Sequence, residues 1–130
     1  MFDYLAIKKK RNMNIDMRIV VDSNDKKIGI SVKKTNLLTR FTGLMFKPSR
    51  TSNLLFDFDK ERRWSIHSFF VFFDFLALWL DGSNNVIEWR IVSPFRFSVV
   101  PSKPFRKLVE IPINRGNKEL IDFFVGKRKV

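Results

Sequence analysis

Residues 64–81 read WSIHSFFVFFDFLALWLD and form the most apolar stretch of the chain. Its ionisable side chains are His67, Asp74 and Asp81, and five of the seven residues from Phe69 to Phe75 are phenylalanine. The stretch is too apolar for a solvated loop and shorter than the roughly 20 apolar residues that a membrane span needs. We therefore expect it to form the centre of a folded core.

Two strands are predicted within this stretch, over residues 64–73 and 75–81. A bend at Asp74 separates them, because an unpaired carboxylate inside a buried strand is costly and a bend exposes it. Residues 75–80 are apolar on both faces, which is typical of an interior strand covered on each side. The pattern thus indicates a sheet with a fully buried central strand.

Strand patterns also occur on both sides of this stretch. They cover residues 17–22, 26–32, 54–59, 86–92 and 108–113. In residues 54–59 phenylalanine and aspartate alternate after two leucines, which is typical of a half-buried strand. Residues 23–25 and 82–85 are polar and predict turns. The chain is therefore predicted to be rich in short strands joined by turns.

Two short helices complete the predicted architecture. Thr35 or Asn36 can cap the first, because a side-chain oxygen accepts the free amide hydrogens of a first turn, and Gly43 ends it. Apolar residues at helical spacing favour a second helix over residues 118–125, which Gly126 ends. The predicted class is α+β: a compact, mostly antiparallel β domain, sandwich- or barrel-like, with two short helices.

Length and composition indicate one globular domain. A chain of 130 residues can bury a single core. We expect a basic, flexible leader over residues 1–16 and a single β-rich domain over residues 17–130. The absence of cysteine excludes disulfides and thiolate metal sites. No signal-peptide or transmembrane pattern occurs, so a cytoplasmic location is expected.

The charge of the chain is strongly positive, with 25 Lys and Arg against 13 Asp and Glu, a net +12. Such a charge favours encounter with polyanions, which makes RNA the first candidate partner. Exposed aromatics such as Trp64 or Phe95 could then stack on unpaired bases. The alternative is dispersed charge that only keeps the protein soluble. The candidate polyanion-binding residues are Lys8, Lys9, Lys10, Arg11, Arg62 and Arg63.

Several motifs together carry a resemblance to a known family. They are Arg40-Phe41-Thr42-Gly43-Leu44-Met45-Phe46, Leu54-Leu55-Phe56-Asp57-Phe58, Ile66-His67-Ser68-Phe69-Phe70-Val71, Leu80-Asp81, Pro94-Phe95-Arg96, Val109-Glu110-Ile111-Pro112 and the late Gly126. In this order and spacing they resemble the archaeal-type members of domain-of-unknown-function family 192. The resemblance covers about residues 17–130 and implies a mostly β single domain without an assigned reaction, cofactor or substrate. Leu76 and Lys127 stand where that family commonly has Asp, so any site built on those carboxylates is altered here.

Residue chemistry offers a second function hypothesis. No phosphate-binding loop, nucleophile elbow or metalloprotease helix occurs, so no catalytic residue, metal site or cofactor is predicted and a non-enzymatic role is favoured. Instead, a small ligand or a protein could bind in a pocket beside Arg40, Met45 and His67. A hydrolase using His67 with Asp57 or Ser65 is a third hypothesis. The abundance of phenylalanine also favours a homodimer that buries surplus apolar surface.

Overall fold

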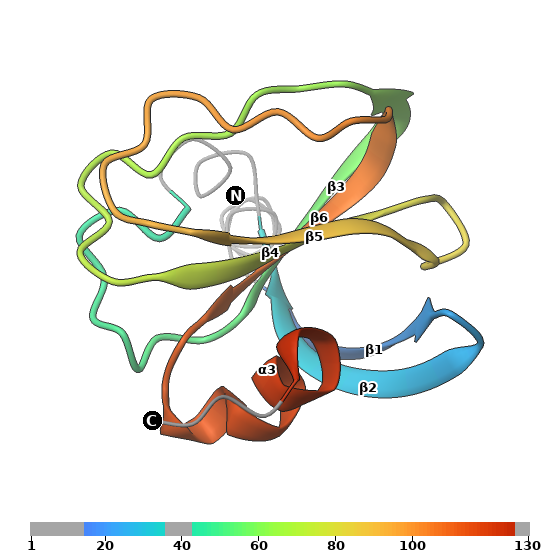
Figure 1. Cartoon of the computed structure of the whole chain (residues 1–130), viewed down its shortest axis with the longest axis horizontal. Coiled ribbons are helices and arrows are strands. Elements are labelled where there is room, and N and C mark those ends of the chain that lie inside the picture. The colour runs from blue at the N-terminus through green and yellow to red at the C-terminus, as the bar shows by residue number, and fades with distance from the viewer. Residues whose placement is uncertain (1–14, 36–42, 127–130) are drawn as a thin grey trace, which may run out of the picture.

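The structure, a computed structural model, describes residues 15–35 and 43–126, and its main feature is a six-stranded sheet curled into a half-barrel (Figure 1). The elements are β1 (Ile15–Ser23), β2 (Lys26–Lys34), β3 (Leu54–Arg62), β4 (Phe75–Leu80), β5 (Val86–Val92), β6 (Phe105–Pro112), the 3-10 helix η1 (Arg115–Asn117) and α3 (Lys118–Val125). The strand order is β1-β2-β3-β6-β4-β5, and only the β2–β3 pair is parallel. The prediction of a mostly antiparallel β domain is therefore confirmed.

The β1–β2 hairpin brings the two edges of the sheet together. Its two-residue turn is made by Asn24 and Asp25, with φ of 52° and 65°. Both residue types tolerate this left-handed conformation, and two such residues give the turn that matches the twist of paired strands. The hairpin tip then reaches the β4–β5 turn, where the Asp22 amide donates to the Asn84 carbonyl at 3.0 Å. The tip of the β1–β2 hairpin and the β4–β5 turn are thus in contact, although they belong to opposite edges of the sheet.

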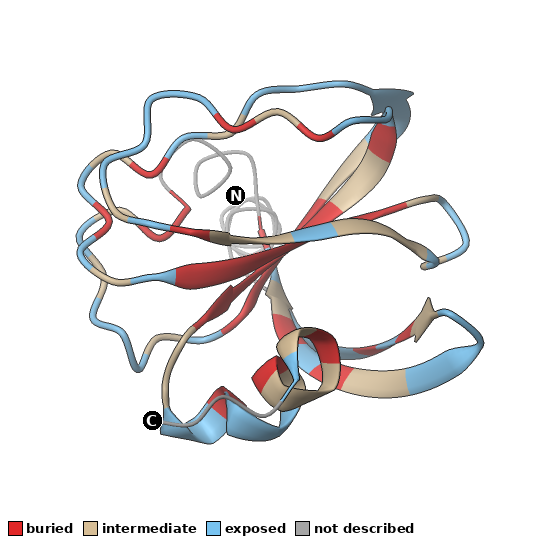
Figure 2. Cartoon of the chain, viewed as in Figure 1, coloured by how far each residue is buried: buried red, intermediate tan, exposed pale blue. Residues whose placement is uncertain are grey.

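Strand β4 pairs with β6 on one side and β5 on the other, and all six of its residues are buried, as predicted (Figure 2). Because side chains alternate along a strand, β4 serves two cores. One face packs with the β1–β2 hairpin and with Ile121 and Phe124 of α3. The other face, which includes Phe75 and Trp79, packs with β3, β6 and the long loops. The candidate site lies on this second face.

The prediction of a strand over residues 64–73 is wrong. This segment is a loop whose backbone makes one isolated β-bridge, between Ile66 and Val99, and then turns at Ser68. Because the backbone turns here, neighbouring apolar side chains point in different directions: Val71 is buried, whereas Phe72 is 61% exposed. The predicted bend that exposes Asp74 is confirmed.

One of the two predicted helices is confirmed. Helix α3 covers the predicted residues and ends at Gly126, whose φ is 86°. The other predicted helix lies mostly over residues 36–42, outside the described residues, as does most of the predicted leader. Across residues 15–35 and 43–126, no helix is long and apolar enough to cross a membrane.

Candidate functional site

A pocket of about 630 Å³ lies between the second face of the sheet and the loops around it. Every second residue of β3 from Phe56 to Arg62 lines it, because strand side chains alternate between faces. Its lining residues are Gly43, Leu44, Met45, Phe56, Phe58, Lys60, Arg62, Trp64, Ser65, Ile66, His67, Val71, Leu108 and Glu110. Most of these side chains are apolar. Of the charged ones, Lys60 and Arg62 are exposed, whereas Glu110 is buried.

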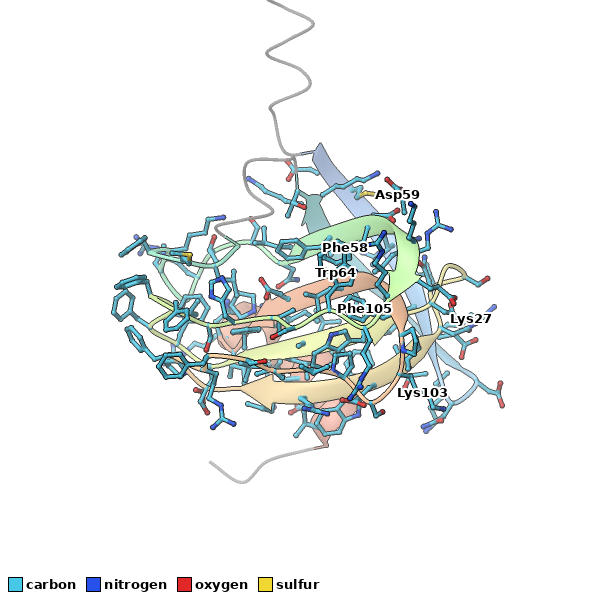
Figure 3. The ribbon with its side chains drawn as sticks, turned by 90° about the horizontal axis from the view of Figure 1, so that it is seen from above. Lys27, Phe58, Asp59, Trp64, Lys103 and Phe105 are labelled. Carbon is cyan, nitrogen blue, oxygen red and sulfur yellow. The ribbon has the colours of Figure 1, made fainter. Side chains whose placement is uncertain are left out.

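One wall of the pocket is aromatic. Phe58 stacks between Phe56 and Trp64, with ring centroids 6.3 Å and 5.9 Å away and ring planes within 9° and 18° of parallel. Phe105 supports Phe58 from behind in an edge-to-face contact at 5.7 Å (Figure 3). These rings form an apolar wall against which another aromatic ring can pack.

Two cations flank the aromatic wall. Lys60 and Arg62 are exposed residues at the end of β3 that line the pocket. The Arg62 guanidinium lies 5.3 Å from the centroid of the Trp64 ring, a cation–π contact that holds it beside the wall. The accessible side of the pocket is therefore positively charged.

Glu110 is the buried acid of the pocket. It stands on β6 between Leu54 of β3 and Ala77 of β4, and only 6% of it is exposed. Burial raises the pKa of its carboxyl group to about 8, although the positive charge of Lys47 favours the ionised form. At neutral pH Glu110 is thus mostly an uncharged acid that can donate a hydrogen bond.

Gly43 provides the space next to this carboxyl group. A Cβ atom at position 43 would lie 3.2 Å from Oε1 of Glu110, closer than most side chains approach each other. Its φ of 50° is also in the left-handed region that favours glycine. Both observations explain why glycine stands here, beside the acid.

The contacts of His67 do not support the hydrolase hypothesis. Its Nδ1 accepts a hydrogen bond from the Phe69 amide at 3.2 Å, and the hydroxyl of Ser65 bonds to that of Ser98 at 2.6 Å. Asp57 is not among the residues that line the pocket. Within the described ranges, no group of three His, Asp or Glu residues could hold a metal ion.

The structure brings together part of the predicted sites. Met45 and His67 both line the pocket, whereas Arg40 lies outside the described residues. Of the candidate polyanion-binding residues, Arg62 lines the pocket, while Arg63 uses its Nε to donate to the Pro101 carbonyl at 2.8 Å. The basic run over residues 8–11 is outside the described residues.

Sequence reasoning missed Glu110 as a site residue. The available signal was an acid inside the apolar strand pattern LVEIPI, residues 108–113. Asp57 and Asp59 alternate with apolar residues, so the pattern allows them to face solvent. Glu110, in contrast, lies on the same strand face as Leu108, which belongs to the core. A carboxyl group at such a buried position lowers the stability of the fold unless it is paired, which makes it a candidate functional residue.

Fold and pocket together define a mostly β half-barrel domain with an apolar, partly cationic pocket. Two crystal structures share this fold. One is of a proposed transcription regulator from Sinorhizobium meliloti 1021, with a TM-score of 0.68 and 16% identity over 82% of this chain and 87% of that chain. The other is of a protein of unknown function from Novosphingobium aromaticivorans, with a TM-score of 0.66 and 11% identity over 81% of this chain and 78% of that chain.

The chain belongs to the UPF0127 family. A UPF0127 protein of Pyrococcus furiosus is 34% identical over 106 residues, which are 79% of this chain and 88% of that protein. A UPF0127 protein of Thermococcus kodakarensis is 33% identical over 58% of this chain and 49% of its own length. The expected membership of an uncharacterised family is thus confirmed. No family model matches the chain, so the resemblance to domain-of-unknown-function family 192 stays a prediction.

Proposed function

We propose that this protein binds a small molecule that combines an apolar ring with an anionic group. The observation that carries the proposal is the pocket itself, in which an aromatic wall, two flanking cations and a buried neutral acid surround one space. Ligand sites of this size are typically apolar concavities with a few polar groups that fix orientation. The sequence predicted a small-ligand pocket beside Arg40, Met45 and His67, and the present proposal adds Glu110 to that pocket.

The pocket suggests how such a ligand would lie. Its ring would pack against the aromatic wall that contains Phe58 and Trp64, and its anionic group would face Lys60 and Arg62. The protonated carboxyl group of Glu110 would donate a hydrogen bond to an acceptor at the inner end of the ligand. Charge at one side and a neutral donor at the other would fix the orientation.

Anilinonaphthalenesulfonate tests this proposal, because it is an aromatic anion that fluoresces when bound in an apolar site. We expect the folded protein to bind one equivalent of it. Reversing both charges beside the wall, Lys60→Glu with Arg62→Glu, should weaken binding by about tenfold or more, since each exposed charge contributes on the order of 1 kcal/mol. Both side chains are exposed, so the fold should persist.

The matched control is Lys103→Glu, which changes an exposed lysine outside the pocket and should leave the affinity for the probe within about twofold. The proposal is refuted if the parent protein binds no probe, or if the two charge reversals at Lys60 and Arg62 have no larger effect than the control.

A polyanion such as RNA is the second candidate ligand. It is supported by the net charge of +12 and by the exposed pair of Arg62 and Trp64, which combines a cation with an aromatic ring. Cation–aromatic surfaces of this kind bind single-stranded nucleic acids through phosphate contacts and base stacking.

A further inference from the structure

Four exposed phenylalanines gather on the loops at one end of the half-barrel. Phe46, Phe70, Phe72 and Phe95 are 68%, 45%, 61% and 45% exposed, respectively. Their rings contact one another: Phe46 stacks on Phe70 at 4.9 Å, and Phe95 meets Phe72 edge to face at 5.4 Å. We call these four residues the phenylalanine cluster. A contiguous exposed apolar group of this kind usually marks an interaction surface.

The backbone of the cluster is strained where the rings are displayed. Phe46, Phe70 and Phe95 have φ of 58°, 54° and 59°, the left-handed region that glycine or asparagine adopts more readily. A bulky side chain in this region costs stability, and exposed rings recover little of it through burial. Local backbone stability therefore does not account for three phenylalanines at these positions.

Buried Ser68 holds the cluster in place. Its hydroxyl donates to the Ser93 carbonyl and accepts from the Arg96 amide, both at 2.6 Å, and its carbonyl accepts from the Phe95 amide at 2.8 Å. The Phe46 amide donates to the Phe70 carbonyl at 2.9 Å. Three loops are thereby joined into one unit that presents the rings outward, so the surface is organised before it meets a partner.

The charges around the cluster identify the partner class. The loop segments over residues 43–53, 64–74 and 93–98 contain three basic residues, Lys47, Arg50 and Arg96, and one acidic residue, Asp74. Lys103 does not belong to this group, because it adjoins Phe105, which pairs with Arg62 at the other end of the sheet. A second copy of this chain would place these like charges against each other. A negatively charged partner complements them.

We infer that the phenylalanine cluster docks the protein on an anionic lipid bilayer. Apolar side chains enter the boundary between headgroups and acyl chains, and neighbouring cations attract the anionic headgroups. Bases stack on free ring faces, whereas these rings pack against one another and form a single apolar projection. That packing favours a membrane over RNA as the occupant.

The test measures co-sedimentation of the full chain with phosphatidylcholine vesicles, prepared with and without phosphatidylserine. We expect binding to the phosphatidylserine vesicles that weakens with salt, because screening reduces attraction between surface charges. The variant Phe46→Asn with Phe95→Asn should bind at least about tenfold more weakly, since two inserted rings are lost. Asparagine tolerates the left-handed conformation, so this variant should melt no earlier than the parent.

Two further variants make the result specific. Trp89→Thr removes another exposed aromatic, from β5, and should bind vesicles as the parent does. Phe72 does not have a positive φ, so Phe72→Ser changes the cluster at a position without backbone strain. This variant should also reduce vesicle binding, and it replaces the asparagine variant if that variant fails to fold. The inference is overturned if the parent protein binds no vesicles, or if folded cluster variants bind vesicles as tightly as the parent does. Loss of RNA binding in the cluster variants, together with no vesicle binding by the parent, would instead identify RNA as the partner and also overturn the inference.

Discussion

Among single residues, Glu110 has the largest consequence for the chemistry of this protein. Its carboxyl group is buried on an interior strand, and its pKa rises from 4.5 to about 8. The folded state therefore holds this proton more tightly than the unfolded state does. The stabilisation is fully present below about pH 4.5 and is lost as the pH rises through about 8.

Glu110→Gln should remove this pH dependence, because glutamine is polar but does not ionise. For the parent, the free energy of unfolding should fall by several kcal/mol across that interval, since each pKa unit corresponds to about 1.4 kcal/mol. Urea unfolding at a series of pH values measures both slopes. Glu119→Gln, on the exposed surface of α3, is the control and should keep the parent slope. Equal slopes for parent and Glu110→Gln would contradict the prediction.

The same ionisation should affect binding in the pocket. Above about pH 8 the carboxylate of Glu110 becomes negative and repels an anionic ligand, so the affinity for anilinonaphthalenesulfonate should decrease. Glu110→Gln should keep its affinity through this range. A fluorescence titration at pH values on both sides of about 8 measures the effect, and a parallel decrease in parent and variant would assign it to another group.

Individual elements differ in how they are stabilised. Strand β4 combines apolar burial with ladder hydrogen bonds to β5 and β6, whereas the loop before β4 and the loop after β5 are joined through Ser68, a fully buried polar residue. Removing a buried hydroxyl leaves its partners unsatisfied, which costs more than the bond itself contributes. The loops that carry the phenylalanine cluster should therefore be sensitive to one polar substitution.

Ser68→Ala should lower the free energy of unfolding by roughly 2–3 kcal/mol, because the Ser93 carbonyl and the Arg96 amide lose a buried partner. Amide hydrogen exchange should accelerate over residues 93–97 more than in β4. The control is Ser65→Ala, which removes an exposed hydroxyl bonded to Ser98 and should cost less than about 0.5 kcal/mol. Comparable losses in the two variants would show that the buried position of Ser68 is unimportant.

At the scale of the whole molecule, charge and shape act on different partners. The net charge of +12 attracts any polyanion at long range, but the pocket and the phenylalanine cluster select by contact. Selectivity should therefore respond to substitutions at these two surfaces, and long-range attraction should respond to salt.

RNA binding by the full chain should fall steeply with salt if polyanion binding is a function, because bound phosphates release counterions. Replacing Lys8, Lys9, Lys10 and Arg11 by Gln, and separately Arg62 and Arg63 by Gln, would show which basic group contributes. Each substituted phosphate contact should reduce the salt slope by about one, as measured by fluorescence anisotropy. Binding that is absent or independent of salt would reject the polyanion hypothesis.

How far sequence patterns predict this fold depends on how local their causes are. The hairpin turn and the buried β4 were predicted correctly, because each follows from residues close together in the chain. The segment over residues 64–73 was predicted as a strand and is a loop. Its turn depends on Ser68 bonding to Ser93 and Arg96, which lie 25 and 28 residues away.

The sequence by itself therefore determined the mostly β fold class, the fully buried strand β4, the strongly positive charge and two of the pocket residues, Met45 and His67. Only the tertiary structure decided that Glu110 lines the same pocket as Phe58 and Trp64, and that the residues of the phenylalanine cluster are exposed. The physical reason is that burial depends on which strands pair. Pairing of β6 between β3 and β4 encloses Glu110, and no pattern within β6 specifies those neighbours.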